Sequence, residues 1–282
     1  MVEGRPRRYT VASMTKASAD SSPLLEVRGL VARYGERTIL NGVDLTVGPG
    51  EIRVVLGGSG CGKSTLLKHC IGLLQPAAGS VRLLGEDLTA VEGAARERLL
   101  TRIGVLFQYG ALLGSLTVGE NVALPLREHT ELPEPIVREI VRLKLAQVEL
   151  AHAENLLPSE LSGGMRKRAA LARAMALDPQ LIFCDEPSAG LDPLTSAELD
   201  ELLLRLRDRF GMSLVVVTHE LASIEKISDR VLMLSGGKAI ADGTLAEVKA
   251  APHPESQAFF GRVAAGEIRK ERSALELLEG TG

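Results

Sequence analysis

The sequence has few aromatic residues, few cysteines and no long apolar run. Its 282 residues include no Trp, three Tyr, five Phe and three Cys, so a core must be built mainly from aliphatic side chains. The spacings of Cys61, Cys70 and Cys184 fit neither a zinc site nor a disulfide framework and indicate a reducing compartment. The longest apolar stretches, such as 214–217, are far shorter than the ~20 residues of a membrane-spanning helix. We therefore expect a globular chain that does not cross a bilayer.

An excess of charge of either sign is also absent. The chain has 33 basic and 36 acidic residues, which excludes bulk electrostatic attraction to nucleic acid, so we expect no nucleic-acid partner. The first residues include Arg5, Arg7 and Arg8 but lack the apolar core of a secretory signal. We expect residues 1–22 to form a disordered leader; a start at Met14 and contact with anionic lipid are the alternatives.

A phosphate-binding motif follows the first β-rich region. Short β-rich runs from Leu24 onward, broken by Gly, Asn and Pro, predict a small antiparallel sheet that ends in a buried strand at 52–56. The next residues read GGSGCGKST and match G-x-x-x-x-G-K-[ST] between a strand and a helical run, which is the context of a P-loop. A glycine turn that only caps a helix is the alternative, and it leaves the Gly-Lys-Ser unexplained.

A P-loop binds phosphate through its backbone N–H groups and through the positive end of the following helix dipole. Lys63 is expected to reach the β- and γ-phosphates, and Ser64 is expected to coordinate Mg²⁺. The predicted nucleotide-binding residues of the loop are Gly57, Gly58, Ser59, Gly60, Cys61, Gly62, Lys63, Ser64 and Thr65.

Two further strands end in residues with catalytic chemistry. The run 181–184 predicts a buried parallel strand with Asp185 at its carboxyl end, where a carboxylate can hold Mg²⁺. Glu186 follows and is the candidate general base for an attacking water. A second strand, 214–218, ends in His219, which is placed to hydrogen-bond a γ-phosphate. A lone histidine at a strand end is more often structural, but its place downstream of an Asp-Glu pair favours catalysis.

A Ser-Gly-Gly turn forms a second candidate anion site. Ser162, Gly163 and Gly164 precede a helix that we predict over 165–177, and a helix start offers free N–H donors to an anion. The alternative is a plain helix cap, which would use the serine. It would not require two adjacent glycines, which lower helix propensity by ~1 kcal/mol each inside a helix.

Together these motifs resemble the ATP-binding cassette (ABC) ATPases, over about Leu24 to Gly243. The resemblance implies an α/β fold, a P-loop NTPase cassette with a RecA-like core, an antiparallel β-subdomain and a helical subdomain at about 112–165. The cassette would span 23–250, and 251–282 would be a C-terminal extension. Tyr34 stands where that family stacks an aromatic ring on adenine, Gln108 corresponds to the Q-loop, and Asp192 belongs to the D-loop.

The resemblance also implies ATP and Mg²⁺ as cofactors and a homodimer as the working form. In the family, the LSGG signature of one copy closes over the P-loop of the other, so Ser162, Gly163 and Gly164 would bind the γ-phosphate in trans. Gln108 would act as a catalytic and metal-binding residue, and Asp192 would couple the two sites.

The stretch between Gln108 and the signature predicts helices and a docking surface. We expect a short helix at 118–124 and a second at 136–150 whose apolar stripe packs within the subdomain. In the loop 109–116, Tyr109, Leu112 and Leu113 are predicted to line a groove that accepts a short helix of a permease.

The residues 107–130, together with Met165 after LSGG where the family often has Gln, look like the ATPases of Mla-type lipid transporters. That resemblance implies phospholipid transport, an MlaE-type permease, an MCE-type substrate-binding protein in the same complex, and a peripheral location on the cytoplasmic face of the inner membrane. The alternatives are an ABC transporter for amino acids or lipoproteins and a non-transport ABC ATPase. The C-terminal residues 261–282 are expected to reach a neighbouring subunit, and Phe259 and Phe260 to pack in the core.

Overall fold

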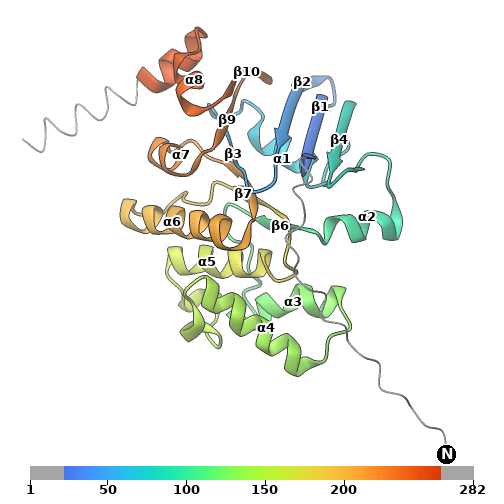
Figure 1. Ribbon diagram of the computed structural model, residues 1–282, viewed down its shortest axis with the longest axis vertical. Helices are drawn as coiled ribbons and strands as arrows, with labels where there is room; N and C mark the ends of the chain where they lie inside the picture. Colours follow the sequence, from blue (N-terminus) through green and yellow to red (C-terminus); the bar gives the residue numbers. More distant parts are fainter. Residues whose placement is uncertain (1–21, 262–282) are drawn as a thin grey trace, which may run out of the picture.

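The computed structural model describes residues 22–261, which form two sheets and a set of helices (Figure 1). The smaller sheet has the order β2-β1-β4-β5 and is antiparallel. Its strands are β1 (Leu25–Tyr34), β2 (Arg37–Val47), β4 (Ala78–Leu83) and β5 (Glu86–Asp87). The predicted antiparallel sheet is therefore confirmed, and its strands are longer than the short β-rich runs suggested.

The larger sheet has six strands in the order β10-β9-β3-β8-β7-β6. They are β3 (Ile52–Gly57), β6 (Ile103–Leu106), β7 (Leu181–Asp185), β8 (Ser213–Val217), β9 (Arg230–Ser235) and β10 (Lys238–Gly243). The expectation that β3 closes the antiparallel sheet is wrong, because β3 pairs in parallel with both β8 and β9. A strand buried along its whole length, as β3 is, needs cover on both faces, and a parallel sheet provides it.

The two faces of the parallel sheet carry separate hydrophobic cores. Ile52, Val54 and Leu56 belong to the first core, and Val55 belongs to the second core, as the alternation of a strand requires. Helices cover the first face, and the antiparallel sheet covers the second together with α1 (Lys63–Cys70) (Figure 1). The chain thus has the α/β class that the sequence predicted.

Between residues 22 and 253, seven further helices surround this frame. They are α2 (Gly93–Leu100), α3 (Val118–His129), α4 (Glu134–Gln147), α5 (Gly163–Ala174), α6 (Pro193–Phe210), α7 (Leu221–Ile227) and α8 (Leu245–Ala250). Two 3-10 turns, η1 (Ala151–Ala153) and η2 (Pro158–Glu160), connect α4 to α5. Of the helices in the range 22–261, none has both the length and the apolar composition needed to cross a membrane.

The helix boundaries differ from the predicted ones. The helix α3 runs past Leu124 to His129 although it contains Pro125, and α4 starts at Glu134 and ends at Gln147. The expectation that the apolar stripe of α4 packs internally is confirmed for Val137, Val141 and Leu145, which are buried, whereas Ile136 is half exposed.

The helix α5 begins two residues earlier than predicted, so Gly163 and Gly164 lie in its first turn. Ser162 is its N-cap and accepts a hydrogen bond from Met165 N at 3.2 Å. At Gly164 a Cβ atom would collide with the Thr195 side chain on α6. Packing against α6 therefore requires glycine at position 164, independently of any ligand.

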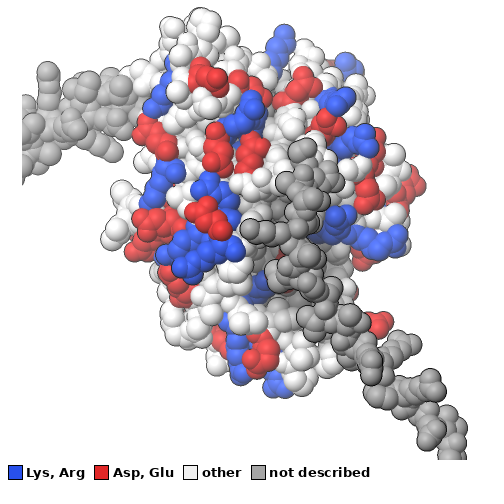
Figure 2. Space-filling model, viewed as in Figure 1, with Lys and Arg blue, Asp and Glu red and all other residues white. Residues whose placement is uncertain are grey.

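Ion pairs tie the helical layer together. Arg168 on α5 contacts Glu149 at 2.5 Å and Glu198 at 3.0 Å, and Arg205 on α6 contacts Glu149 at 2.5 Å. On the face shown in Figure 2, Lys and Arg side chains are interspersed with Asp and Glu. The charge balance of the sequence thus extends to the pairing of individual side chains.

After α8, a last helical segment covers 254–261. Phe259 and Phe260 meet edge to face with ring centroids 5.1 Å apart and pack against the first core, as predicted. Residues 1–21 of the predicted leader and residues 262–282 of the predicted extension lie outside the described residues, so the expectations for these segments stay predictions.

A buried carboxylate makes stability depend on pH. Asp200 on α6 accepts a hydrogen bond from Ser223 Oγ on α7 at 2.8 Å, and burial raises the pKa of Asp200 to about 6. The folded chain holds the carboxyl proton of Asp200 more tightly than the unfolded chain does. The contribution of protonated Asp200 to the free energy of unfolding is therefore complete below pH ~4 and is lost as the pH rises through about 6.

We predict that Asp200→Asn removes this pH-dependent loss of stability, which amounts to up to about 3 kcal/mol in the free energy of unfolding between pH 4 and pH 8. Urea unfolding of both proteins across this range measures it, and Asp208→Asn, an exposed change on the same helix, is the control. Parallel stability curves for the Asp200→Asn variant and the wild type would contradict the prediction.

Candidate active site

The carboxyl ends of four neighbouring strands bring the predicted catalytic segments together. In the order β3, β8, β7, β6, the pairs Val55–Val217, Asp185–Val217 and Leu106–Cys184 are in register. The P-loop, His219, the Asp-Glu pair and Gln108 each follow one of these strands. Parallel pairing therefore brings four segments that are far apart in the sequence to the same end of the sheet, the carboxyl end of its strands.

The P-loop is closed by its own lysine. Lys63 Nζ donates to the carbonyl oxygens of Gly57 at 2.7 Å and Gly58 at 3.1 Å. At Gly57 a Cβ atom would collide with the carbonyl oxygen of Leu234 on β9, so the close approach of these strands requires glycine. The helix α1 starts at Lys63, which leaves the first N–H groups of the helix free for an anion.

Other predicted residues of the nucleotide site differ in their exposure. Gly58, Ser59, Gly60 and Ser64 are exposed, whereas Cys61 is 8% exposed and its side chain belongs to the second core. Cys61 can therefore face a phosphate only through its backbone. Tyr34 is half exposed at the tip of the β1–β2 hairpin, and this hairpin adjoins the P-loop because Leu40 packs against Gly62.

Two carboxylates at the end of β7 keep oxygen atoms without an internal partner. Among the described residues, Asp185 Oδ1 and Glu186 Oε2 are buried and accept no hydrogen bond. Burial, followed by repulsion from Glu186, raises the pKa of Asp185. Unpaired buried carboxylate oxygens are costly, and oxygen ligands are the ones that Mg²⁺ prefers. With the exposed hydroxyl of Ser64 across the sheet edge, these residues fit a magnesium ion.

Glu186 is held in a defined position. Its φ of +46° lies in the left-handed region, which is uncommon for a non-glycine residue, and its N–H donates to Val217 O at 2.8 Å. Its Oε1 lies 2.9 Å from His219 Nδ1, and the side chain of His219 is 61% exposed. The structure thus brings the predicted base and the predicted histidine into hydrogen-bond contact.

A residue that the sequence analysis missed connects two of these segments. Lys167 on α5 is buried, and its Nζ donates to the carbonyl oxygens of Gln108 and, at 3.1 Å, of Glu186. Burial lowers the pKa of Lys167, while Asp185 and Glu186 favour its charged form. The signal was present in the sequence, because position 167 shares a helix face with Gly164 and Leu171, which are buried.

The Ser162–Gly164 segment lies apart from the P-loop of the same chain. The helix α5 packs in the first core and α1 in the second, so their starts lie on opposite faces of the parallel sheet. Asp192 caps α6 by accepting from the N–H groups of Leu194 and Thr195, each at 3.1 Å. Hydrogen bonds from Thr195 lower the pKa of Asp192, which stays ionised.

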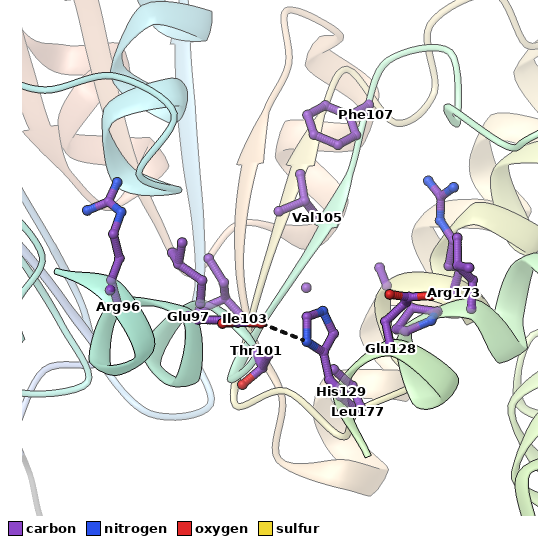
Figure 3. Close-up of a pocket in the computed structure, with 16 residues that line it drawn as sticks. Arg96, Glu97, Thr101, Ile103, Val105, Phe107, Glu128, His129, Arg173 and Leu177 are labelled. Carbon is purple, nitrogen blue, oxygen red and sulfur yellow. Dashed lines mark ion pairs between the residues drawn. The ribbon is translucent and has the colours of Figure 1, made fainter. Parts of the chain in front are cut away.

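A hollow lies close to the loop that was predicted to form a docking groove. This hollow of about 750 Å³ lies between α2, β6, α3 and α5, with Leu100, Val105, Phe107, Leu124 and Leu177 among its lining residues (Figure 3). His129 and Glu97 form an ion pair across it, with 3.6 Å between Nδ1 and Oε1. Tyr109, Leu112 and Leu113 are not among the lining residues of this hollow, and a groove at these three residues stays a prediction.

These three residues lie on the loop beside the hollow instead. Tyr109 is 88% exposed, Leu113 is partly exposed and Leu112 packs against the first core. The loop is held from inside, because Arg173 donates to the carbonyl oxygens of Gly110 and Ala111. Buried Asn121 also bonds the loop, since its Nδ2 donates to Leu113 O at 3.1 Å and its Oδ1 accepts from Leu113 N at 2.8 Å.

The sequence is similar to known transport proteins. It matches the family model described as ABC transporter over residues 40–189. It is 41% identical over 248 residues to the intermembrane phospholipid transport system ATP-binding protein MlaF of Escherichia coli K12, which covers 87% of this chain and 91% of that protein. The MlaF protein of Haemophilus influenzae is 42% identical over 221 residues, which covers 78% of this chain and 84% of that protein.

A mycobacterial relative and two solved structures extend the comparison. The probable ribonucleotide transport ATP-binding protein mkl of Mycobacterium tuberculosis is 45% identical over 224 residues, so the match covers 78% of this chain but only 62% of that protein. The structure of cbiO1 from Clostridium perfringens, part of an ABC transporter complex, has a TM-score of 0.75 at 28% identity and covers 81% of this chain and 91% of that chain. A dimeric cassette in a post-hydrolysis state with ADP and Pi has a TM-score of 0.71 at 30% identity, covering 78% and 98%.

Proposed function

The chain belongs to the ABC transporter family, and on this premise we propose that it is the ATP-hydrolysing subunit of a transporter that moves phospholipid through a membrane permease. The observation that carries the proposal is the alignment of P-loop, Asp185, Glu186, His219 and Gln108 along one edge of the parallel sheet. A site of this kind can hold a nucleotide triphosphate at the P-loop and a water beside Glu186.

In the proposed reaction Glu186 removes the proton of the attacking water. Its Oε2 has no partner among the described residues and is free to accept that proton, while His219 bonds Oε1 and orients the carboxylate. Lys63, which now bonds two loop carbonyls, would turn to the phosphates. Ser64, Asp185 and Gln108 would hold Mg²⁺, which neutralises phosphate charge when it is bound.

The proposed working form is a homodimer that sandwiches two ATP molecules. Ser162, Gly163 and Gly164 start α5 on the sheet face opposite to α1, so they do not complete the P-loop of their own chain. A second copy related by two-fold symmetry would supply them in trans, with Asp192 near the boundary between the two sites. The dimeric solved cassette supports this arrangement.

We further propose that the hollow between α2 and α3 receives a short helix of an MlaE-type permease. Apolar residues such as Leu100 and Leu124 line the hollow. Phe107, on its wall, directly precedes Gln108 (Figure 3). A helix seated there would contact the residue next to a catalytic group. This docking would hold the chain on the cytoplasmic face of the inner membrane, in a complex that includes an MCE-type protein.

Phospholipid is the proposed cargo because the relatives that match over most of both chains carry that substrate in their names. A ribonucleotide is the second candidate, since the mycobacterial relative is named for it. These names favour both cargoes over the amino acid and lipoprotein alternatives.

We predict that Glu186→Gln keeps ATP binding but lowers turnover by about 10²–10⁴-fold, because the amide cannot take the proton of the water. Phosphate release measures turnover, and size analysis with ATP should show a trapped dimer. Lys63→Ala should instead weaken ATP binding, and Glu201→Gln, an exposed change on α6, is the neutral control. Normal turnover in Glu186→Gln would exclude Glu186 as the base.

We predict that Leu124→Arg releases the chain from its permease, because a guanidinium would have to be buried in the apolar hollow. Co-purification of the permease with the tagged chain from membranes measures docking. Leu143→Arg, on the exposed face of α4 with Leu143 62% exposed, is the matched control. ATP binding by each isolated variant checks its folding, and equal permease recovery with both variants would contradict the docking site.

The cargo is tested by identifying what the intact membrane complex carries. We expect mass spectrometry of the purified complex to find bound phospholipid, and phospholipid vesicles to stimulate its ATPase activity. A complex that carries no phospholipid and responds to added ribonucleotides would shift the assignment to the second candidate.

A further inference from the structure

Lys167 joins three segments that the proposed reaction uses. It lies on α5, five residues after Ser162, and its ammonium group bonds the carbonyl oxygens of Gln108 and Glu186. The side chain is only 6% exposed, so water does not compete for these hydrogen bonds. One buried cation therefore links the helix of the signature, the Q-loop and the end of β7.

The contacts of Lys167 differ from those expected of a stabilising buried charge. Both hydrogen-bond acceptors are neutral backbone carbonyls, and an ammonium that leaves water for such a site pays a desolvation cost that a Met or Leu side chain would avoid. The nearby carboxylates of Asp185 and Glu186 offset only part of this cost, because burial has the largest effect on the pKa of Lys167 and lowers it. Its position is therefore better explained by what it holds in place than by a contribution to stability.

The peptide groups that Lys167 bonds belong to residues whose orientation matters. Glu186 has a φ of +46°, which costs energy for a non-glycine residue unless its surroundings hold it. Three hydrogen bonds hold its backbone: its own N–H donates to Val217 O at 2.8 Å, and its carbonyl accepts from Lys167 Nζ at 3.1 Å and from Ala189 N at 3.2 Å. Without the bond from Lys167, Ala189 N is the one remaining donor to this carbonyl among the described hydrogen bonds, so the peptide is held less firmly and the carboxylate can move with it.

We propose that Lys167 is a positioning residue that sets the orientation of Glu186 relative to the Q-loop and to α5. Through this link, a displacement of α5 or of the Q-loop moves the proposed base. Hydrolysis would therefore depend on two positions: that of Ser162, which the partner's nucleotide holds, and that of the residues around Gln108, which the permease holds. The inference rests on the proposed ATPase function.

Lys144 provides a matched control for the loss of a buried ammonium. It is 5% exposed on α4, and its Nζ pairs with Asp178. This pair joins α4 to the segment before β7. Within residues 22–261, neither side chain forms a hydrogen bond with the P-loop, Gln108 or Glu186. Lys144→Met therefore removes a buried charge without touching the proposed reaction.

The test compares Lys167→Met, Lys167→Arg and Lys144→Met in the full chain and in its membrane complex, with kcat and KM for ATP and urea stability measured for each. We expect Lys167→Met to lower kcat about tenfold or more while KM changes less than about threefold, because orientation and not ATP binding is lost. Lys167→Arg, which keeps donors for both carbonyls, should recover much of kcat. Lys144→Met should lower stability and leave kcat within about twofold.

A double variant separates positioning from a general structural role. If Lys167 acts through Glu186, adding Lys167→Met to Glu186→Gln should not slow the residual single-turnover rate further, whereas independent effects would multiply. Should Lys167→Met fail to fold, Lys167→Gln gives the same comparison with a shorter donor.

Two outcomes would overturn the inference: a kcat of Lys167→Met within about twofold of the wild type, or multiplied rate losses in the double variant. A wild-type chain and complex that bind ATP without hydrolysing it would instead overturn the proposed function itself. The two failures are therefore distinguishable.

Discussion

Parallel pairing of β3, β8, β7 and β6 is the constraint on which the rest of the site depends. Neighbouring strands in a sheet lie about 4.8 Å apart, so segments that leave adjacent strands at the same end must lie close together. The P-loop, His219, Glu186 and Gln108 all leave at that end. Both faces of the strands are buried in hydrophobic cores, so a one-residue slip would move each side chain from one core to the other and disrupt the packing of both.

The segments at this edge have little regular structure, and cations bonded to backbone carbonyls hold them. Lys63 closes the P-loop, Lys167 joins the Q-loop to Glu186, and Arg173 holds the loop after Gln108. Charge-assisted hydrogen bonds are shorter and stronger than neutral ones, particularly where water is excluded. The same residues that fix the loops thus connect them to α1 and α5, so the site is sensitive to the position of both helices.

The division of the molecule into two cores explains why one copy is insufficient for the proposed reaction. The helix that starts at Lys63 belongs to the core beneath the antiparallel sheet, and the helix capped by Ser162 belongs to the core of the helical layer. Each helix start offers unpaired N–H groups, but the sheet separates them. A two-fold arrangement of two chains is the proposed way for both to face one nucleotide, and it leaves the hollow beside Phe107 available for the permease.

The sequence by itself determined the local chemistry of this protein. The P-loop, the Asp-Glu pair after an apolar run and the Ser-Gly-Gly turn could be predicted because short-range backbone geometry and the apolar pattern of buried strands constrain residues that are neighbours in the chain. Only the tertiary structure decided that β3 joins the parallel sheet, that Leu124 and not Tyr109 lines the hollow, and that Lys167 is buried against Glu186. These features depend on which surfaces meet across long sequence separations, and no local pattern specifies the partner that a strand, an apolar side chain or a lysine will find.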